Sequence, residues 1–330
     1  MLLRLLYPHR ANRSLNMPRT RLAGKPLLVI LGPTAVGKTG LAIEIAQAIG
    51  GEIVGADSRQ IYRRMDIGTA KPTPEQRARA PHHLLDMVDP DGNLALAQYQ
   101  KAAYAAIDAV HRRGNLPLLV GGTGQYLTAV IEGWTVPEVP PNPALRAELE
   151  TFAAEQGAET LHQRLKLLDP AAAAAIHHRN VRRVIRALEV CIEAGQPIST
   201  LQRKNPPPYA MLQYGLTLDR AELYARADRR VDEMMAAGFL DEVKNLLASG
   251  YSRSLPSMSG LGYRQLAAHV LDGVPLEETI ATTKHATHDF IRRQYTWFRG
   301  HDTGILWHNI KKINAALLIE NIYQWLREQG

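Results

Sequence analysis

The sequence predicts an α/β fold in which a parallel sheet is flanked by helices and interrupted by an all-helical insertion. Three observations predict it. Short apolar runs rich in branched residues alternate with helical patterns. The first of these runs ends in a Gly-Pro turn that opens a helix, and a block of purely helical pattern lies between two proline-rich links. Alternating strands and helices favour parallel strands with right-handed crossovers.

The elements of the first half follow one another at short intervals. Residues 26–31 predict a buried strand, and apolar residues at helical spacing predict a helix over 38–49 that ends at a glycine pair. A second strand, a long helix and a third strand are then predicted at 52–56, 94–113 and 116–120.

The second half changes in texture. Four prolines between 137 and 143 form a link, residues 144–195 are helical in pattern, and a second link spans Asn205–Pro208. Strands are predicted again at 211–218 and 304–308. The chain therefore divides into a leader at 1–23, a discontinuous core at 24–138 and 209–330, and a helical insertion at 139–208.

Bulk composition sets further limits. With 330 residues, 45% hydrophobic and 22% charged, the chain suits a globular protein with more than one unit. The basic leader has the bias of a transit peptide, but we favour a disordered leader or a start at Met17. Cys191 alone excludes an intrachain disulfide, and no run of about 18 apolar residues indicates a membrane span. We expect a cytoplasmic monomer.

A phosphate loop follows the first strand. The run Gly32-Pro33-Thr34-Ala35-Val36-Gly37-Lys38-Thr39 fits the pattern G-x-x-x-x-G-K-[ST] between a strand and a helix, and this predicts a P-loop NTPase-like sheet. Backbone amides at the helix N-terminus would face phosphate oxygens, Lys38 would reach the outer phosphate, and the Thr39 hydroxyl suits Mg²⁺. The motif does not define the phosphate compound.

Two further strand ends carry polar groups. Asp57 follows the second strand and could hold Mg²⁺ through water, accept a proton from an attacking amine, or cap a helix. Thr123 lies in the turn Gly121–Gly124 after the third strand and could bond a leaving phosphate oxygen or cap the next helix. Ligands of open α/β sheets bind at this edge.

Several longer blocks resemble one family. Residues 57–62 (DSRQIY), 65–72 (MDIGTAKP), 81–86 (PHHLLD), 119–124 (LVGGTG), 186–190 (RALEV), 260–265 (GLGYRQ) and 292–299 (RRQYTWFR) are similar to tRNA dimethylallyltransferases, also called tRNA isopentenyltransferases. The resemblance covers about residues 26–300, and the lone cysteine favours the shorter bacterial form.

This resemblance implies transfer of a prenyl group from dimethylallyl diphosphate to the exocyclic amine of the adenosine 3′ of a tRNA anticodon. The phosphate loop would then grip the diphosphate with Lys38 and Mg²⁺ on Thr39. Asp57 matches the general base, and Thr123 matches a residue at the scissile bond. Either Arg226 or Arg230 would contact the diphosphate.

Basic residues indicate where tRNA would bind. Arg179, Arg182, Arg183 and Arg186 would share one helical face, and Arg292, Arg293 and Arg299 are interleaved with aromatic residues that could stack on bases or fill the core. The resemblance extends the expected tRNA contacts to Asp57, Ser58, Arg59, Gln60, Thr123, Arg146, Val184, Ile185, Gly262, Tyr263, Arg264, Gln294 and Trp297.

Three other functions stay open on the residues alone. A kinase could bind ATP in the loop and use the insertion as a lid. A prenyltransferase could use free adenine nucleotides, although the basic insertion favours a macromolecular acceptor. An RNA-binding module without activity would not need Lys38, Thr39, Asp57 and Thr123.

Overall fold

A six-stranded parallel sheet forms the centre of the protein. The computed structural model describes residues 25–137, 139–302 and 304–329, so the predicted leader at 1–23 lies outside the described residues. The sheet order is β3-β2-β4-β1-β5-β6, which confirms the predicted fold class. The strands are β1 Lys25–Leu31, β2 Gly51–Ala56, β3 His82–His83, β4 Leu116–Gly121, β5 Tyr209–Thr217 and β6 Leu306–Asn309.

Each face of the sheet has its own apolar core. In β1, Leu27, Val29 and Leu31 face one core, whereas Leu28 and Ile30 face the other, as expected when side chains alternate along a strand. The first core is closed by α3 Leu96–Arg112, α4 Gly124–Glu132, α11 Phe239–Ala248 and α12 Tyr263–Asp272. The second is closed by α1 Lys38–Ile49, α10 Arg220–Ala236 and α14 Ala315–Glu328.

One long helix, α13 Leu276–Gly300, contributes to both cores. Phe298 packs in the first core and Ile291 in the second. The two-residue strand β3 and the short helix α2 Pro74–Arg79 are not evident in the sequence, because neither is long enough to show a period.

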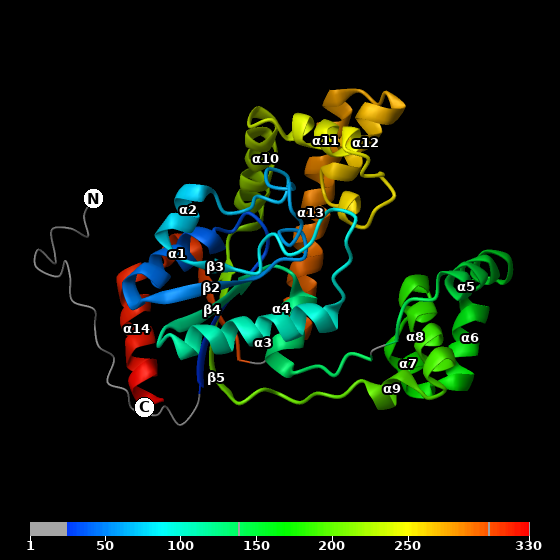
Figure 1. The fold of residues 1–330 in the computed structure, drawn as a ribbon, viewed down its shortest axis with the longest axis horizontal. Coiled ribbons are helices and arrows are strands. Elements are labelled where there is room, and N and C mark those ends of the chain that lie inside the picture. The colour runs from blue at the N-terminus through cyan, green and yellow to red at the C-terminus, as the bar shows by residue number, and fades with distance from the viewer. Residues whose placement is uncertain (1–24, 138, 303, 330) are drawn as a thin grey trace, which may run out of the picture.

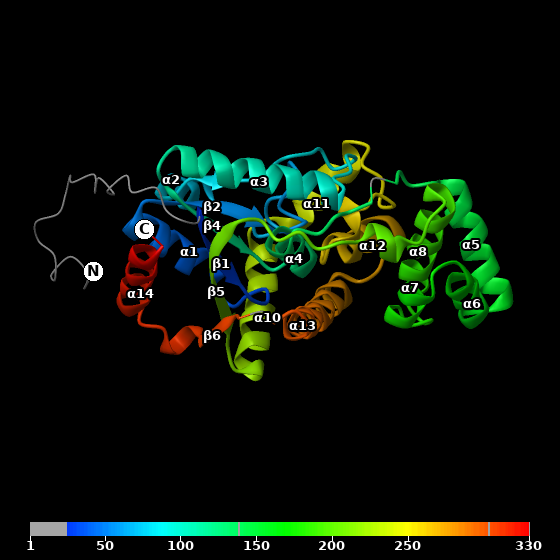
Figure 2. The same cartoon turned by 90° about the horizontal axis from the view of Figure 1, so that it is seen from below.

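The residues between the two links form a separate helical domain. It contains α5 Pro143–Gln156, α6 Ala158–Leu168, α7 Pro170–Ala175, α8 Val181–Ala194 and α9 Ile198–Leu201. Its own core includes Leu149, Leu161, Leu165 and Leu188. Figures 1 and 2 both show this domain at one end of the molecule, apart from the sheet.

The two links pair where they leave the core. The Thr135 amide donates to the Arg203 carbonyl at 2.8 Å, and the Asn205 amide donates to the Gly133 carbonyl at 2.9 Å. Lys204 also forms an ion pair with Glu132 at 2.7 Å. The helical domain is therefore joined to the core through one paired neck.

The helical domain corrects two expectations. Val184 and Ile185 are 0% and 4% exposed in its core, so their side chains cannot contact tRNA. Helix α8 begins at Val181 with Asn180 as its N-cap, so Arg179 precedes the helix and does not share its face.

Among the described residues, no helix combines the length and apolar character that crossing a bilayer requires.

A substitution tests whether this domain depends on its own core. Leu188→Ala removes a side chain that is 1% exposed, and we expect it to cost about 2–5 kcal/mol of local stability. Amide hydrogen exchange should accelerate in α5–α9 and stay unchanged in the sheet. Leu167→Ala, at a position that is 85% exposed, is the matched control. Faster exchange across the sheet as well would show that the two cores unfold together.

Candidate active site

The phosphate loop lies at the carboxyl end of β1, in the middle of the sheet. Ala35 and Gly37 adopt positive φ angles of 62° and 106°, which turn successive backbone amides toward one side. No side chain caps α1 at its N-terminus. The first turn of α1 therefore presents amide donors and the positive end of the helix dipole to an anion.

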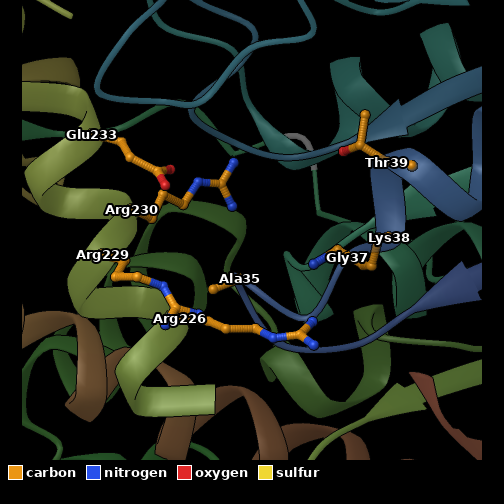
Figure 3. Close-up of a pocket in the computed structure, with 9 residues that line it drawn as sticks. Ala35, Gly37, Lys38, Thr39, Arg226, Arg229, Arg230 and Glu233 are labelled. Carbon is orange, nitrogen blue, oxygen red and sulfur yellow. The ribbon is translucent and has the colours of Figure 1, made fainter. Parts of the chain in front are cut away.

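A polar cavity of about 500 Å³ opens in front of this loop. Lys38 and Thr39 lie on one wall, and Arg226, Arg229, Arg230 and Glu233 of α10 lie on the other. Figure 3 shows the arginines extending from α10 toward the loop. Three guanidinium groups and one ammonium group outweigh the single Glu233 carboxylate, so the cavity attracts an anion such as a diphosphate.

Two of the arginines were both candidates for the diphosphate contact, and both line the cavity. Arg226 is paired with Glu222 at 3.2 Å. Arg230 is more enclosed: burial lowers its pKa, and the nearby Asp57 carboxylate opposes that shift. Of the two candidates, Arg230 is thus the one whose charge interacts with both Lys38 and Asp57. Arg229 and Glu233 were not predicted, because no motif marks them beyond their helical spacing.

The Lys38 ammonium lies among the polar groups of three loops. Its Nζ donates to the Pro33 carbonyl at 2.8 Å. Although part of the side chain faces the cavity, burial lowers the pKa of Lys38 to about 8, Asp57 opposes the shift, and Arg230 adds to it. The carboxylate of Asp57 and the ammonium of Lys38 are therefore close enough to interact.

Asp57 and Thr123 meet at the ends of neighbouring strands. The Thr123 Oγ1 accepts from the Ser58 amide at 3.0 Å and lies 3.3 Å from the Ser58 Oγ. The Asp57 carboxylate accepts from the Arg59 amide at 2.9 Å. The structure thus brings together Lys38, Asp57 and Thr123, which are far apart in the sequence.

Gln294 of α13 lies beneath these loops. Its side chain is 5% exposed and hydrogen-bonds the Thr34 amide and the Gly122 carbonyl. Both ends of its amide are bonded within the protein, so Gln294 supports these loops, and its contact with tRNA stays a prediction. Gly122 and Gly124 are required here: a Cβ on Gly122 would come within 2.6 Å of the Gln294 Nε2, and one on Gly124 would overlap the Trp297 ring.

Other residues predicted to contact tRNA hold neighbouring loops in this structure. Arg59 donates to the Pro256 carbonyl at 2.7 Å, and Gln60 donates to the carbonyls of Thr69 and Ala70. Tyr263 is 1% exposed and donates to the Glu242 carboxylate. Gly262 packs against the Phe239 ring, where a side chain would not fit. The Tyr263 side chain therefore cannot reach RNA, and Arg59 and Gln60 have structural partners.

The basic and aromatic run of α13 divides by exposure. Arg292, Arg293 and Arg299 are exposed, as is Arg264 of α12. Phe298 is buried, and Trp297 donates to the Thr128 hydroxyl at 3.0 Å and stacks on His301. Of the two alternatives left open for the aromatic residues, packing describes Phe298, whereas Trp297 is half-buried and its contact with tRNA stays a prediction.

A buried carboxylate organises the basic residues of the helical domain. Glu189 is 0% exposed and accepts from the guanidinium groups of Arg146 and Arg186 and from the Asn142 amide. Burial opposes its charge, but these hydrogen bonds keep the pKa of Glu189 below its usual value. Both arginines stay more than one-third exposed. Arg182 and Arg183 are exposed and have no ionic partner among the described residues.

Fold and site together define a P-loop enzyme that acts on a phosphate- or diphosphate-bearing substrate, with a carboxylate and a hydroxyl beside the loop. A family model described as "IPP transferase" matches residues 60–301. The chain therefore belongs to the IPP transferase family, which confirms the resemblance seen in the sequence.

Individual relatives agree. The tRNA dimethylallyltransferase of Roseiflexus castenholzii is 58% identical over 83% of this chain and 90% of its own. The enzyme of that name from Thermomicrobium roseum is 50% identical over 93% of each chain. The tRNA isopentenylpyrophosphate transferase of Bacillus halodurans has a TM-score of 0.69 and 39% identity, covering 92% of this chain and 98% of that one. A eukaryotic dimethylallyltransferase acting on tRNA has a TM-score of 0.72 and 27% identity, covering 86% and 74%.

The pKa of Lys38 generates a pH prediction. The charged form dominates below about pH 8 and the neutral form above it, so affinity for dimethylallyl diphosphate should fall by about tenfold per pH unit once Lys38 loses its proton. Titration calorimetry between pH 7 and 10 measures this fall. Lys38→Arg keeps a charge throughout and should lose the pH dependence. An identical fall in that variant would assign it to another group.

Proposed function

We propose that the chain transfers a dimethylallyl group from dimethylallyl diphosphate to the exocyclic amine of the adenosine 3′-adjacent to the anticodon of tRNA, at position 37. The observation that carries this proposal is that Lys38, in the wall of an arginine-lined cavity, lies near Asp57, with Thr123 on the neighbouring loop. A site of this kind holds a diphosphate on one side and can accept an amine proton on the other.

Each residue of the site has its own role in the proposed reaction. The amine nitrogen attacks the allylic carbon, the bond from that carbon to the diphosphate oxygen breaks, and pyrophosphate leaves. Asp57 accepts the proton that the amine loses. Lys38, Arg226 and Arg230 stabilise the charge that gathers on the leaving diphosphate, and Thr123 donates a hydrogen bond near the breaking bond.

Mg²⁺ fits the same cavity as a partner of the diphosphate. Thr39 and Glu233 offer a hydroxyl and a carboxylate on its walls. Mg²⁺ usually takes few protein ligands together with phosphate oxygens and water, and oxygen donors of these two kinds suit it. When bound, the ion would neutralise diphosphate charge.

The anticodon stem-loop would bind along the helical domain and the exposed arginines of α12 and α13. Arg182 and Arg183 lie in the first turn of α8, where positive charge opposes the helix dipole. A tRNA phosphate there would be attracted by both arginines and by the helix end. We propose further that the protein acts as a monomer in the cytoplasm, where a lone buried thiol such as Cys191 stays reduced.

A transfer assay tests the proposed function. Labelled dimethylallyl diphosphate is incubated with the protein, Mg²⁺ and either unmodified tRNA or AMP. We expect label on tRNA at the adenosine after the anticodon. Label on AMP alone would assign a free-nucleotide acceptor, and tight binding of ATP without binding of the prenyl donor would assign a kinase.

The base role of Asp57 has its own test. Asp57→Asn removes the proton acceptor with little change in size, so we expect kcat to fall by roughly 10²–10⁴-fold while tRNA binding in a filter assay stays unchanged. Asp91→Asn, at an exposed loop position, is the control for loss of one carboxylate. An unaltered rate in Asp57→Asn would remove this residue as the base.

The first turn of α8 predicts a salt effect. The double variant Arg182→Ala/Arg183→Ala should weaken tRNA binding and reduce the slope of log K against log salt by about two, one for each lost phosphate contact. Arg112→Ala/Arg327→Ala removes the same charge from exposed positions of α3 and α14. If both double variants show the same slope, the α8 arginines do not touch phosphates.

A further inference from the structure

Gln294 bonds both loops that border the reacting groups. Its Oε1 accepts from the Thr34 amide at 2.9 Å, and its Nε2 donates to the Gly122 carbonyl at 2.8 Å. A single buried amide thus connects the phosphate loop to the turn that precedes Thr123. A buried amide is costly unless both of its ends are hydrogen-bonded, and here both ends are.

The two loops hold different parts of the reaction. The phosphate loop carries Lys38 and Thr39, which face the diphosphate. The turn after β4 carries Thr123, whose hydroxyl contacts Ser58 beside Asp57. The bond that breaks lies between these two groups, so the separation of the loops sets the geometry of attack. Displacements of about 1 Å in such geometry can cost roughly a hundredfold in rate.

Helix α13 holds Gln294 in a fixed place. One turn further along, Trp297 bonds the Thr128 hydroxyl of α4. On its other side α13 contacts the antiparallel helix α10 through three polar pairs, spaced four residues apart on each helix. The pairs are Lys284 with Asp232 at 2.7 Å, His288 with Asp228 at 2.8 Å, and Arg292 with the Tyr224 hydroxyl. The same helix therefore holds Gln294 and the helix that carries the cavity arginines.

We propose that Gln294 is a positioning residue for the transfer, with its amide setting the separation between the phosphate loop and the Thr123 turn. This inference rests on the proposed function. It explains why a polar side chain stands at a position that is 5% exposed, where an apolar residue of the same length would satisfy packing alone.

Two substitutions at Gln294 and one control test the proposal. Gln294→Met keeps the length and removes both hydrogen bonds. Gln294→Glu keeps an acceptor for the Thr34 amide, but an ionised carboxylate cannot donate to the Gly122 carbonyl. Thr296→Ala is the control, because Thr296 is exposed and, within the part of the chain that the structure describes, bonds the Arg292 carbonyl of its own helix alone.

We expect Gln294→Met to lower kcat by about 10–100-fold, since the two loops lose their shared partner. The loss of two hydrogen bonds also lowers its melting temperature, so kcat and tRNA affinity are compared at a temperature where Gln294→Met and Thr296→Ala are both folded, and there we expect equal tRNA affinity. Gln294→Glu should regain activity relative to the wild type as the pH falls, because a protonated carboxyl group both donates and accepts. A purely structural role would not produce this pH-dependent ratio.

The outcomes separate cleanly. The proposal is overturned if Gln294→Met is as active as Thr296→Ala. It is also overturned if activity is lost only to the extent that the protein unfolds and the activity of Gln294→Glu, divided by that of the wild type, does not change with pH. If the wild-type chain transfers nothing to tRNA, the proposed function fails and binding of inorganic pyrophosphate decides the role of Gln294. Weaker binding by Gln294→Met than by the control would keep Gln294 as the residue that positions the phosphate loop, and equal binding would overturn that role as well.

Discussion

The order of strands in the sheet is the constraint on which the site depends. β4 lies between β1 and β2, and all three are parallel, so the turns that follow them emerge side by side at one edge. The phosphate loop, the Gly121–Gly124 turn and the Asp57 loop therefore stand in a row. This arrangement places Lys38 beside Gly122, and Thr123 beside Ser58. Backbone pairing alone brings the three loops together, and side chains only refine their spacing.

Charged side chains that are half-buried or fully enclosed provide part of that refinement. Glu242 of α11 accepts hydrogen bonds from three consecutive amides, those of Asp66, Ile67 and Gly68. Lys71 is almost fully enclosed and pairs with Asp66 and Asp86. Burying a charge is expensive unless its partners are complete, and such groups often serve to specify one conformation. Here they fix the segment that follows Asp57, in which Arg64, Ala70, Leu84 and Asp86 all have positive φ angles.

The sequence allowed the fold to be predicted where local patterns were strong. The phosphate loop has a complete motif between a strand and a helix, and the helical insertion is bounded by prolines, so both were evident. The partners of Gln294, Arg59 and Tyr263 were not, because each bonds residues far away in the sequence. Motif blocks mark residues that matter without separating those that touch a ligand from those that hold a loop. Val184 and Ile185 show the same limit. Their spacing beside the basic residues was compatible with a buried or an exposed face of the helix, and the packing of the domain buries them.

The paired neck bears on how the chain folds. β5 pairs with β1 along seven residues, yet the entire helical domain separates them in the sequence. A domain built from neighbouring helices has local contacts and is expected to form quickly. Once it has formed, its two ends are held together by the bonds between Gly133–Thr135 and Arg203–Asn205. The chain that must close between β1 and β5 is then effectively much shorter, and the entropy lost on closing that loop falls accordingly.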